Sequence, residues 1–191
     1  MLLEIGAGVL SHATSLDSAR VEMLAGDLTA AAGQLERDYE ALGELGEKYV
    51  RSSIGGLLAR VYAMQQRDDE AFALSQDVEA NAAEDDVDPQ ALWRAARGLV
   101  LARRGEAAEA LRLAEEALAL RMQSDSPVEQ AEALTDLAEI KQAAGDLDGA
   151  IEALQRARDL LTVKGDLPSV GRLTLALEGL HVADPKQAAS A

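Results

Sequence analysis

Few side chains in this sequence have the types and spacing that catalysis requires. The two histidines, His12 and His181, lie near opposite ends of the chain, so we expect two isolated histidines and no acid–base pair. Residues 43–48, GELGEK, place a lysine after a glycine, but a phosphate-binding loop needs a longer spacing and a hydroxyl after the lysine. The motifs G-x-S-x-G and H-E-x-x-H are absent. We therefore expect no enzymatic activity.

Carboxylates are abundant, and one segment partly matches a calcium-binding loop. Residues 144–155, AGDLDGAIEALQ, have the expected residue types at the third, fifth and sixth positions of such a loop. Its first and twelfth positions need carboxylates but are Ala144 and Gln155. Asp136 and Glu139 resemble a catalytic pair, yet such pairs on an acidic helical protein usually belong to a solvated face. We expect no metal site and no cofactor.

Composition and charge narrow the remaining classes. The 191 residues are 48% hydrophobic but only 3% aromatic, which favours a core of Ala, Leu and Val packed between close helices. A net charge of −16 opposes binding to nucleic acid and to anionic membrane surfaces. The chain has no cysteine, and its start lacks the basic region of a targeting signal. No apolar run reaches the length of a membrane span, and we expect a cytoplasmic protein.

The elements that must position any site are helices. Residues 91–120 predict two helices joined by a turn at Gly105, with an apolar stripe at helical spacing on the second. This pattern recurs at a period of 40, 39 and 40 residues, marked by Ala31, Ala71, Ala110 and Ala150. Twelve residues before each marker the residue is small, and ten before it is β-branched: Ala19, Ala59, Gly98 and Ala138, then Val21, Val61, Val100 and Ile140. A fixed period in this range predicts an array of helical repeats.

We predict an all-α fold built as one solenoid of antiparallel helical hairpins over residues 1–180. The four hairpins and the C-terminal capping helix are predicted at about 6–43, 47–82, 89–122, 127–163 and 168–180, followed by a disordered tail at 181–191.

Boundary residues agree with these divisions. Gly26 with Asp27, and Gly145 with Asp146, each supply a helix stop followed by an N-cap. Ser126 and Glu129 have capping-box spacing. We expect Asp88 to cap a helix that begins at Pro89, and Glu106 to lie in the first turn after Gly105. The second hairpin has Gln66 where the others have a turn glycine, and it also departs from the pattern at Ser75.

A small residue, a turn glycine seven residues later and an alanine five after that resemble the tetratricopeptide repeat, in a variant longer than the usual period of about 34. Residues 91–111 and 133–154 also resemble the C-terminal repeats of large bacterial signalling ATPases, including those linked to nucleotide cyclases or helix-turn-helix regulators. The resemblance implies a right-handed α-solenoid whose leading helices line a concave groove. Chaperone-binding members clamp a carboxylate with asparagines, but this chain has only Asn81, so we do not expect that activity.

The resemblance also implies which side chains face the groove. If the register holds, arginines from successive repeats form a ladder suited to carboxylates, with methionines beside them for adaptable apolar contact. The predicted groove residues are Arg20, Met23, Arg60, Met64, Leu99, Arg103, Glu139 and Gln142. The groove would bind an acidic or C-terminal peptide segment. In the alternative, these arginines only pair with acidic residues on neighbouring helices.

Three classes of function remain open. We favour a non-catalytic protein–protein interaction module that belongs to, or partners, a bacterial signalling or regulatory protein. Its partner would be a protein, a peptide or a neighbouring domain of the same chain, with no nucleic acid and no membrane. The alternatives are a structural spacer or homo-oligomerising module, and a small-molecule-sensing domain of a regulator.

Overall fold

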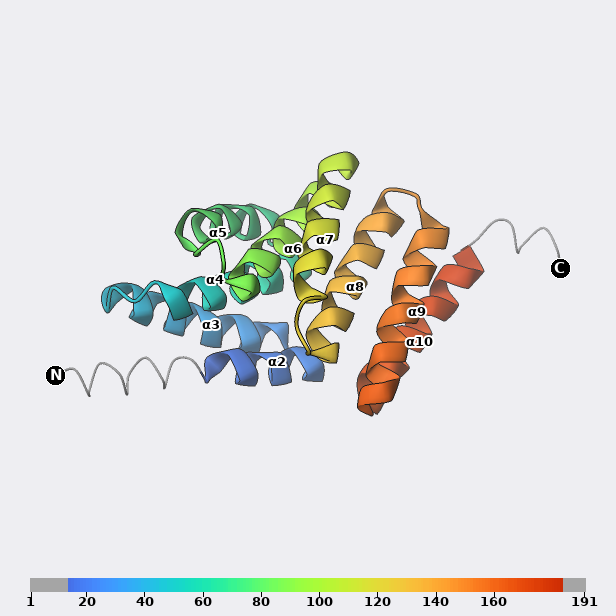
Figure 1. The fold of residues 1–191 in the computed structure, drawn as a ribbon, viewed down its shortest axis with the longest axis horizontal. Helices are drawn as coiled ribbons and strands as arrows, with labels where there is room; N and C mark the ends of the chain where they lie inside the picture. The colour runs from blue at the N-terminus through green and yellow to red at the C-terminus, as the bar shows by residue number, and fades with distance from the viewer. Residues whose placement is uncertain (1–13, 184–191) are drawn as a thin grey trace. The chain divides into compact units, whose positions relative to one another are not determined.

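The computed structural model describes residues 14–183, with side chains described to residue 181. This part of the chain folds into nine α-helices with short connections and no strand (Figure 1). The helices are α2 Ser15–Ala25, α3 Leu28–Glu44, α4 Tyr49–Met64, α5 Asp68–Asn81, α6 Val87–Arg103, α7 Ala107–Arg121, α8 Pro127–Ala143, α9 Leu147–Lys164 and α10 Leu167–Ala183. The all-α prediction is confirmed for the described residues.

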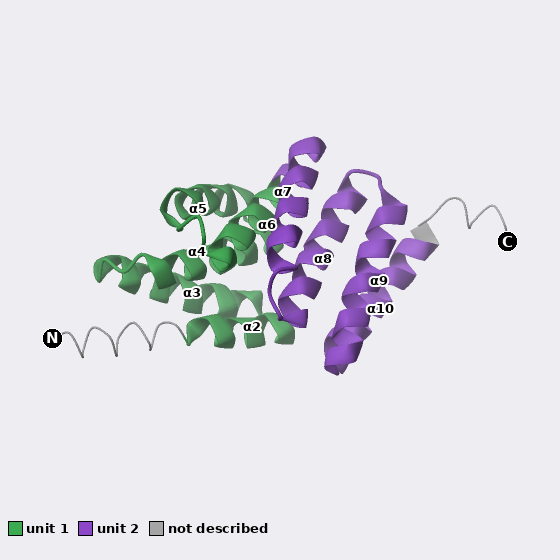
Figure 2. Cartoon of the chain, in the orientation of Figure 1, with its two compact units in different colours: residues 1–100 green, residues 101–191 purple. Residues whose placement is uncertain are grey.

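The chain divides into two compact units, residues 1–100 and 101–191 (Figure 2). In the first unit α2 packs on α3, α3 on α4 and α4 on α5. In the second α7 packs on α8, α8 on α9 and α9 on α10. The predicted third hairpin, 89–122, falls across the division, and a single continuous solenoid over residues 1–180 stays a prediction.

Each unit has a core of small and branched aliphatic side chains. One buried core cluster of the first unit comprises Ala19, Ala31, Ala32, Leu35, Leu42, Ile54, Leu57, Leu58, Val61 and Leu92. That of the second comprises Ala131, Leu134, Ala138, Ala150, Ala153, Leu154, Ala157, Leu161, Leu173, Leu177 and Leu180. Alanine at these contacts lets helix backbones approach closely, which compensates for the near absence of large aromatic residues.

The repeat columns found in the sequence are buried columns in the structure. All four marker alanines are 0% exposed: Ala31, Ala71, Ala110 and Ala150. In the β-branched column Val61, Val100 and Ile140 are also 0% exposed, but Val21 is 61% exposed. Val21 lies on α2, the first helix of the described part, where no described hairpin precedes it.

The turns between paired helices have one shared backbone conformation. Gly26, Gly105 and Gly145 have φ of 84°, 82° and 83° and accept the left-handed conformation at little cost. Gln66, at the equivalent place in the second hairpin, has φ of 60°. The second hairpin therefore makes the same turn without a glycine, at the steric cost that a Cβ atom brings there.

Most predicted caps are present. Asp27 Oδ1 accepts a 2.9 Å hydrogen bond from the Ala30 N–H, and Asp146 Oδ1 accepts one of the same length from Gly149. Ser126 Oγ accepts the Glu129 N–H at 3.4 Å. The Glu129 carboxylate, however, pairs with Arg121 at 3.2 Å, so the reciprocal half of the capping box is replaced by an ion pair.

Three boundary predictions are corrected. Helix α6 begins at Val87, two residues before Pro89, so Asp88 lies in its first turn and does not cap it. Glu106 is the N-cap residue of α7, and its side chain makes no capping bond. Helix α10 continues to Ala183, so residues 181–183 are helical; His181 Nδ1 lies 2.7 Å from the Leu177 carbonyl oxygen, one turn back. Residues 6–13 of the first predicted hairpin, with His12, and residues 184–191 lie outside the described part.

The strained turn gives a first prediction. Replacing Gln66 with glycine should raise the free energy of unfolding by about 0.5–1 kcal/mol, because it removes the left-handed penalty at an exposed side chain. Gly105→Ala is the matched control and should lower it by about 1 kcal/mol, since an added Cβ meets nothing within 4 Å and only backbone strain remains. Urea denaturation would measure both; a destabilised Gln66→Gly would contradict the assignment of strain.

The buried marker column gives a second prediction. Ala110→Leu should cost about 1–3 kcal/mol, because Ala110 is fully buried and the longer side chain overpacks its contact. Ala119→Leu, at an exposed position of the same helix, is the control and should be nearly neutral. Thermal unfolding of both variants would measure this, and equal melting temperatures would argue against the repeat register.

Candidate functional site

The predicted groove residues of the first unit include two arginines that are not free on the surface. Arg20 on α2 lies 3.8 Å from the Asp88 carboxylate on α6, and its side chain is 20% exposed. Arg60 on α4 is only 5% exposed. An acidic ligand would have to displace Asp88 from Arg20 and would reach little of Arg60.

The apolar residues predicted beside these arginines have different environments. Met23 is partly buried against the core of the first unit, and Leu99 is 1% exposed. Met64, near the end of α4, is 40% exposed and offers apolar surface to a partner. Of the predicted apolar groove residues, Met64 is therefore the one best placed for contact.

The second unit brings together two of its three predicted groove residues. Arg103 Nη1, at the end of α6, lies 3.3 Å from Glu139 Oε1 on α8. Gln142, one turn further along α8, is exposed. The ion pairs of Arg20 and Arg103 match the alternative interpretation of the groove arginines, in which they pair with acidic residues on neighbouring helices. A ladder spanning both units stays a prediction.

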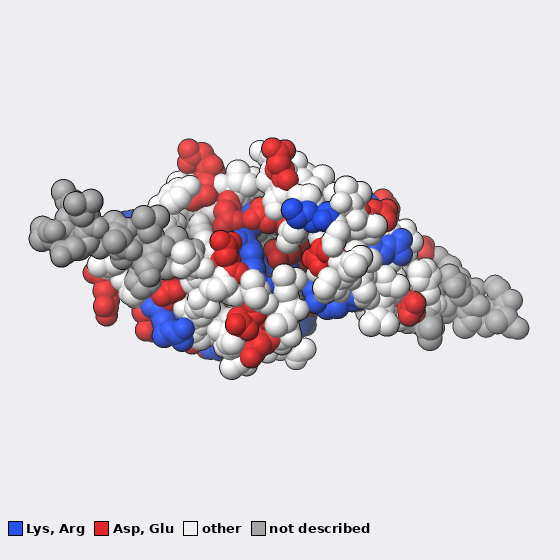
Figure 3. Space-filling model, turned by 90° about the horizontal axis from the view of Figure 1, so that it is seen from below, with Lys and Arg blue, Asp and Glu red and all other residues white. Residues whose placement is uncertain are grey.

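Acidic and basic side chains are interspersed on the face drawn in Figure 3. Figure 3 shows them next to one another on the face it displays, without separation into one acidic and one basic patch. Arg112, for example, pairs with Glu109 and Glu116 on its own helix. The whole chain has 34 acidic against 18 basic residues, so acidic side chains are in excess.

The structure reveals a hollow in the first unit that the sequence analysis missed. It is an open depression of about 340 Å³, lined by residues of three helices: Glu36, Tyr39 and Glu40 of α3, Leu58 and Tyr62 of α4, and Glu70, Ala73 and Leu74 of α5. We call it the Tyr39–Tyr62 pocket. Its volume lies at the lower end of the range of about 300–1,000 Å³ that is typical of ligand sites.

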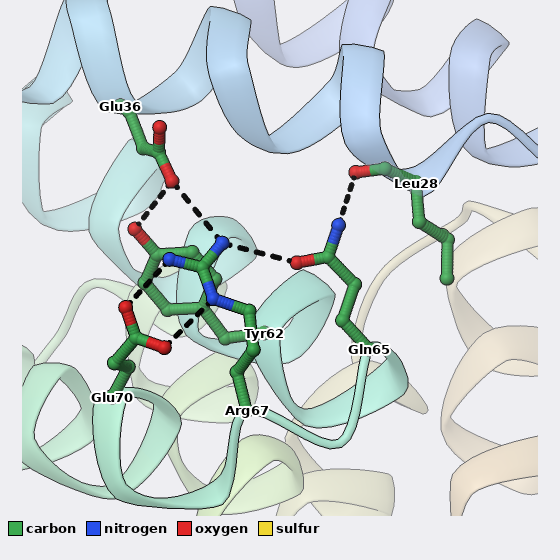
Figure 4. Close-up of polar contacts among 6 residues, drawn as sticks. All are labelled: Leu28, Glu36, Tyr62, Gln65, Arg67 and Glu70. Carbon is green, nitrogen blue, oxygen red and sulfur yellow. Dashed lines mark hydrogen bonds and ion pairs between the residues drawn. The ribbon is translucent and has the colours of Figure 1, made fainter.

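One wall of this pocket is a polar network centred on Arg67 (Figure 4). The guanidinium lies over the Tyr62 ring, 3.9 Å from its centroid. Arg67 donates to Glu70 at 2.6 and 2.7 Å and to Glu36 at 3.3 Å. Tyr62 donates its hydroxyl to the same Glu36 oxygen at 2.8 Å. The network thus fixes Tyr62, Glu36 and Glu70 in place before any ligand arrives.

The same network ties α4 to α3. Gln65 Nε2 donates to the Leu28 carbonyl at 2.9 Å, and Arg67 donates to Gln65 Oε1 at 3.2 Å (Figure 4). Leu28 is the first residue of α3, so this bond links the start of α3 to the turn that follows α4.

The other tyrosine of the lining, Tyr39, is held in the same way by a second arginine. Arg51 lies over the Tyr39 ring, 3.9 Å from its centroid, and 3.6 Å from Asp77. The Tyr39 hydroxyl donates to the same Asp77 carboxylate, and Arg51 Nε donates to the Tyr39 carbonyl at 3.3 Å. Both tyrosines of the pocket therefore carry an arginine on the ring and a carboxylate on the hydroxyl.

The pKa shifts follow from these contacts. Burial, and then the bond to Glu36, raises the pKa of Tyr62 to about 12. Burial and the bond to Asp77 raise the pKa of Tyr39 further. The hydrogen bond from Arg67 lowers the pKa of Glu70, and the same bond raises the pKa of Arg67. All of these groups therefore hold fixed charge states at neutral pH.

Sequence spacing contained a signal for this pocket. Glu36, Tyr39 and Glu40 stand at i, i+3 and i+4 and so share one face of a helix, and Arg67 and Glu70 are an i, i+3 pair. What could not be foreseen is that Tyr62, 23 residues after Tyr39, meets the same hollow. Between residues 14 and 183 there is no group of acidic or histidine side chains that could hold a metal ion. In the same part of the chain no helix is both long and apolar enough to cross a membrane.

Comparison with known proteins identifies the class of fold to which this chain belongs. The chain is an all-α helical-repeat protein. A family model described as tetratricopeptide repeat matches residues 89–162, a stretch that runs from α6 into α9. No curated protein matches the sequence.

Three solved structures are similar. BtubC (BKLC) from P. vanneervenii has a TM-score of 0.51 at 18% identity, over 77% of this chain and 61% of that one, and it supports the helical-repeat fold. The putative kinesin light chain TPR-like repeats of Podosopora anserina, and a variant of the same repeats with one residue replaced, give TM-scores of 0.49 and 0.48 at 16% identity, over 89% of this chain and 94% of theirs. The finer resemblance to signalling ATPases stays a prediction.

The pocket yields a third prediction, on pH. In the folded protein the neutral Tyr62 is favoured, because its pKa is raised from the usual 10.0 to about 12. This contribution to stability is complete below pH 10 and is lost as the pH rises towards 12. Ultraviolet absorbance of the phenolate, compared between the parent and Tyr62→Phe, should show a step near pH 12 that the variant lacks. If the step that distinguishes the two proteins lies near pH 10 instead, the pKa of Tyr62 is not raised by burial and by the bond to Glu36.

Proposed function

We propose that this chain is a non-catalytic protein-interaction module that binds a peptide segment of a partner protein. Tetratricopeptide repeats are generally protein–protein interaction modules, and the match over residues 89–162 is the observation that carries the proposal. Rigid helices joined by short turns present fixed side chains to a partner at low entropic cost. The resemblance of residues 91–111 and 133–154 to bacterial regulators supports a partner within a cytoplasmic signalling or regulatory assembly.

Two surfaces of the module are candidates for the peptide. One is the leading helices of each unit: Met64 is exposed in the first unit and Gln142 in the second, while Arg20 and Arg103 have acidic partners. The other is the Tyr39–Tyr62 pocket of the first unit. Tyrosine is enriched at protein interfaces because it combines a large rigid ring with a hydroxyl, which favours the pocket.

Selection from a random peptide display library tests this function. The folded protein should enrich related sequences that bind, as synthetic peptides, with a Kd on the order of 10 μM. An unrelated helical protein of similar net charge is the control for electrostatic capture. If the two proteins enrich the same peptides, or this chain enriches none, the proposed function is wrong.

Two variants would locate the bound peptide. Met64→Glu changes an exposed groove residue without removing core contacts, and it should weaken peptides that use the leading helices, acidic ones most of all. A variant filling the Tyr39–Tyr62 pocket should leave such peptides unaffected. Light scattering at several concentrations would report self-association, which is the competing interpretation.

A further inference from the structure

We propose that the Tyr39–Tyr62 pocket recognises an arginine side chain of the partner. The proposal deepens the proposed function, on which it rests, by naming the chemistry of the peptide. It also reverses the charge expected from the sequence, where an arginine ladder predicted an acidic ligand.

The first argument is the charge of the lining. Three glutamates face this hollow, and two of them, Glu36 and Glu70, are bonded to the guanidinium of Arg67. The third, Glu40 on α3, is exposed and has neither a hydrogen bond nor an ion pair among the described residues. A cation of the partner at this position would be attracted to the Glu40 carboxylate, because no cationic group in the described part of the chain pairs with it.

The second argument is the chemistry of the two rings. Arg51 and Arg67 already cover one face of Tyr39 and of Tyr62, so a guest cation would use the ring surface that still lines the hollow. Aromatic ring faces attract cations, and a planar, weakly hydrated guanidinium packs on a ring better than the strongly hydrated ammonium of lysine does. Leu58, Ala73 and Leu74 complete the lining with apolar surface that suits the methylene stem of arginine. The aromatic rings, the carboxylate and the apolar surface together match the guanidinium and the methylene stem of one arginine side chain.

The third argument is that the chain binds its own arginines in this way. Arg51 over Tyr39 and Arg67 over Tyr62 each lie 3.9 Å from the ring centroid, and each pairs with a carboxylate that also accepts the tyrosine hydroxyl. These two contacts hold the pocket walls in position. A guest arginine would enter a site whose tyrosines and acids are already fixed, so little side-chain freedom is lost on binding.

Peptide titrations monitored by protein NMR test the proposal. The ligands are blocked pentapeptides Gly-Ser-Xaa-Ser-Gly, where Xaa is arginine, lysine or the neutral isostere citrulline. The arginine peptide should shift amide signals of residues lining the pocket saturably, with a Kd on the order of 1 mM. The lysine peptide should bind more weakly, and the citrulline peptide should not saturate. Equal binding of arginine and citrulline peptides would overturn a cation site.

Two matched pairs of variants separate the pocket from general attraction to an acidic protein. Ala73→Leu fills the pocket without changing charge, whereas Ala80→Leu makes the same change at an exposed position elsewhere on α5. Glu40→Gln and Glu44→Gln remove the same charge from neighbouring turns of α3, but only Glu40 lines the pocket. The first member of each pair should weaken binding of the arginine peptide by up to about tenfold. The second member should weaken it by less than about twofold. Melting temperatures would confirm that all four variants fold.

The outcomes distinguish this inference from the proposed function. If both members of each pair weaken the arginine peptide equally, the binding is nonspecific and the pocket assignment is wrong. If peptides from the display library bind Ala73→Leu as tightly as the parent, the chain is still an interaction module but its site lies elsewhere. If no library peptide binds and the pentapeptide titration alone behaves as expected, the pocket stands and the proposed function fails.

Discussion

Close contact between helices at small residues is the constraint on which the rest of this structure depends. Ala31, Ala71, Ala110 and Ala150 are completely buried, one in each repeat. With so few aromatic residues, the core cannot fill wide gaps between helices, so the helices must approach until alanine and leucine side chains suffice. Gly55 shows how close that approach becomes, because a Cβ atom there would lie 2.7 Å from the Tyr39 ring.

That same packing creates the Tyr39–Tyr62 pocket. Tyr39 lies against Gly55 of α4, so its ring is held at the junction of α3 and α4. Tyr62 is held two turns further along α4 by Arg67 and Glu36. The pocket between them is bounded by helices whose spacing the small residues set, and its tyrosines stay neutral because burial and carboxylate acceptors disfavour the phenolate.

The arginines show why charge alone is a weak guide to a binding surface. Arg20, Arg51, Arg67 and Arg103 all lie within ion-pair distance of an acidic side chain from elsewhere in the fold. In an acidic chain each arginine has several carboxylates within reach. An ion pair within the fold costs less entropy than an ion pair with a separate ligand. Glu40, by contrast, is exposed and has no ion pair among the described residues, in a chain that carries more acidic than basic residues.

The sequence by itself determined the helices, their turns and the buried columns, because these follow from local rules. Glycines at Gly26, Gly105 and Gly145 stop helices through their own φ angles, and a period of about 40 residues repeats the apolar face. It could not determine that Gln66 would adopt the same turn, since a residue with a Cβ atom disfavours the left-handed conformation that the turn requires. It also missed the pocket, because Glu36, Tyr62 and Glu70 become neighbours only when three helices pack. Which carboxylate each arginine meets is likewise decided by distances between helices, and these exist only in the folded protein.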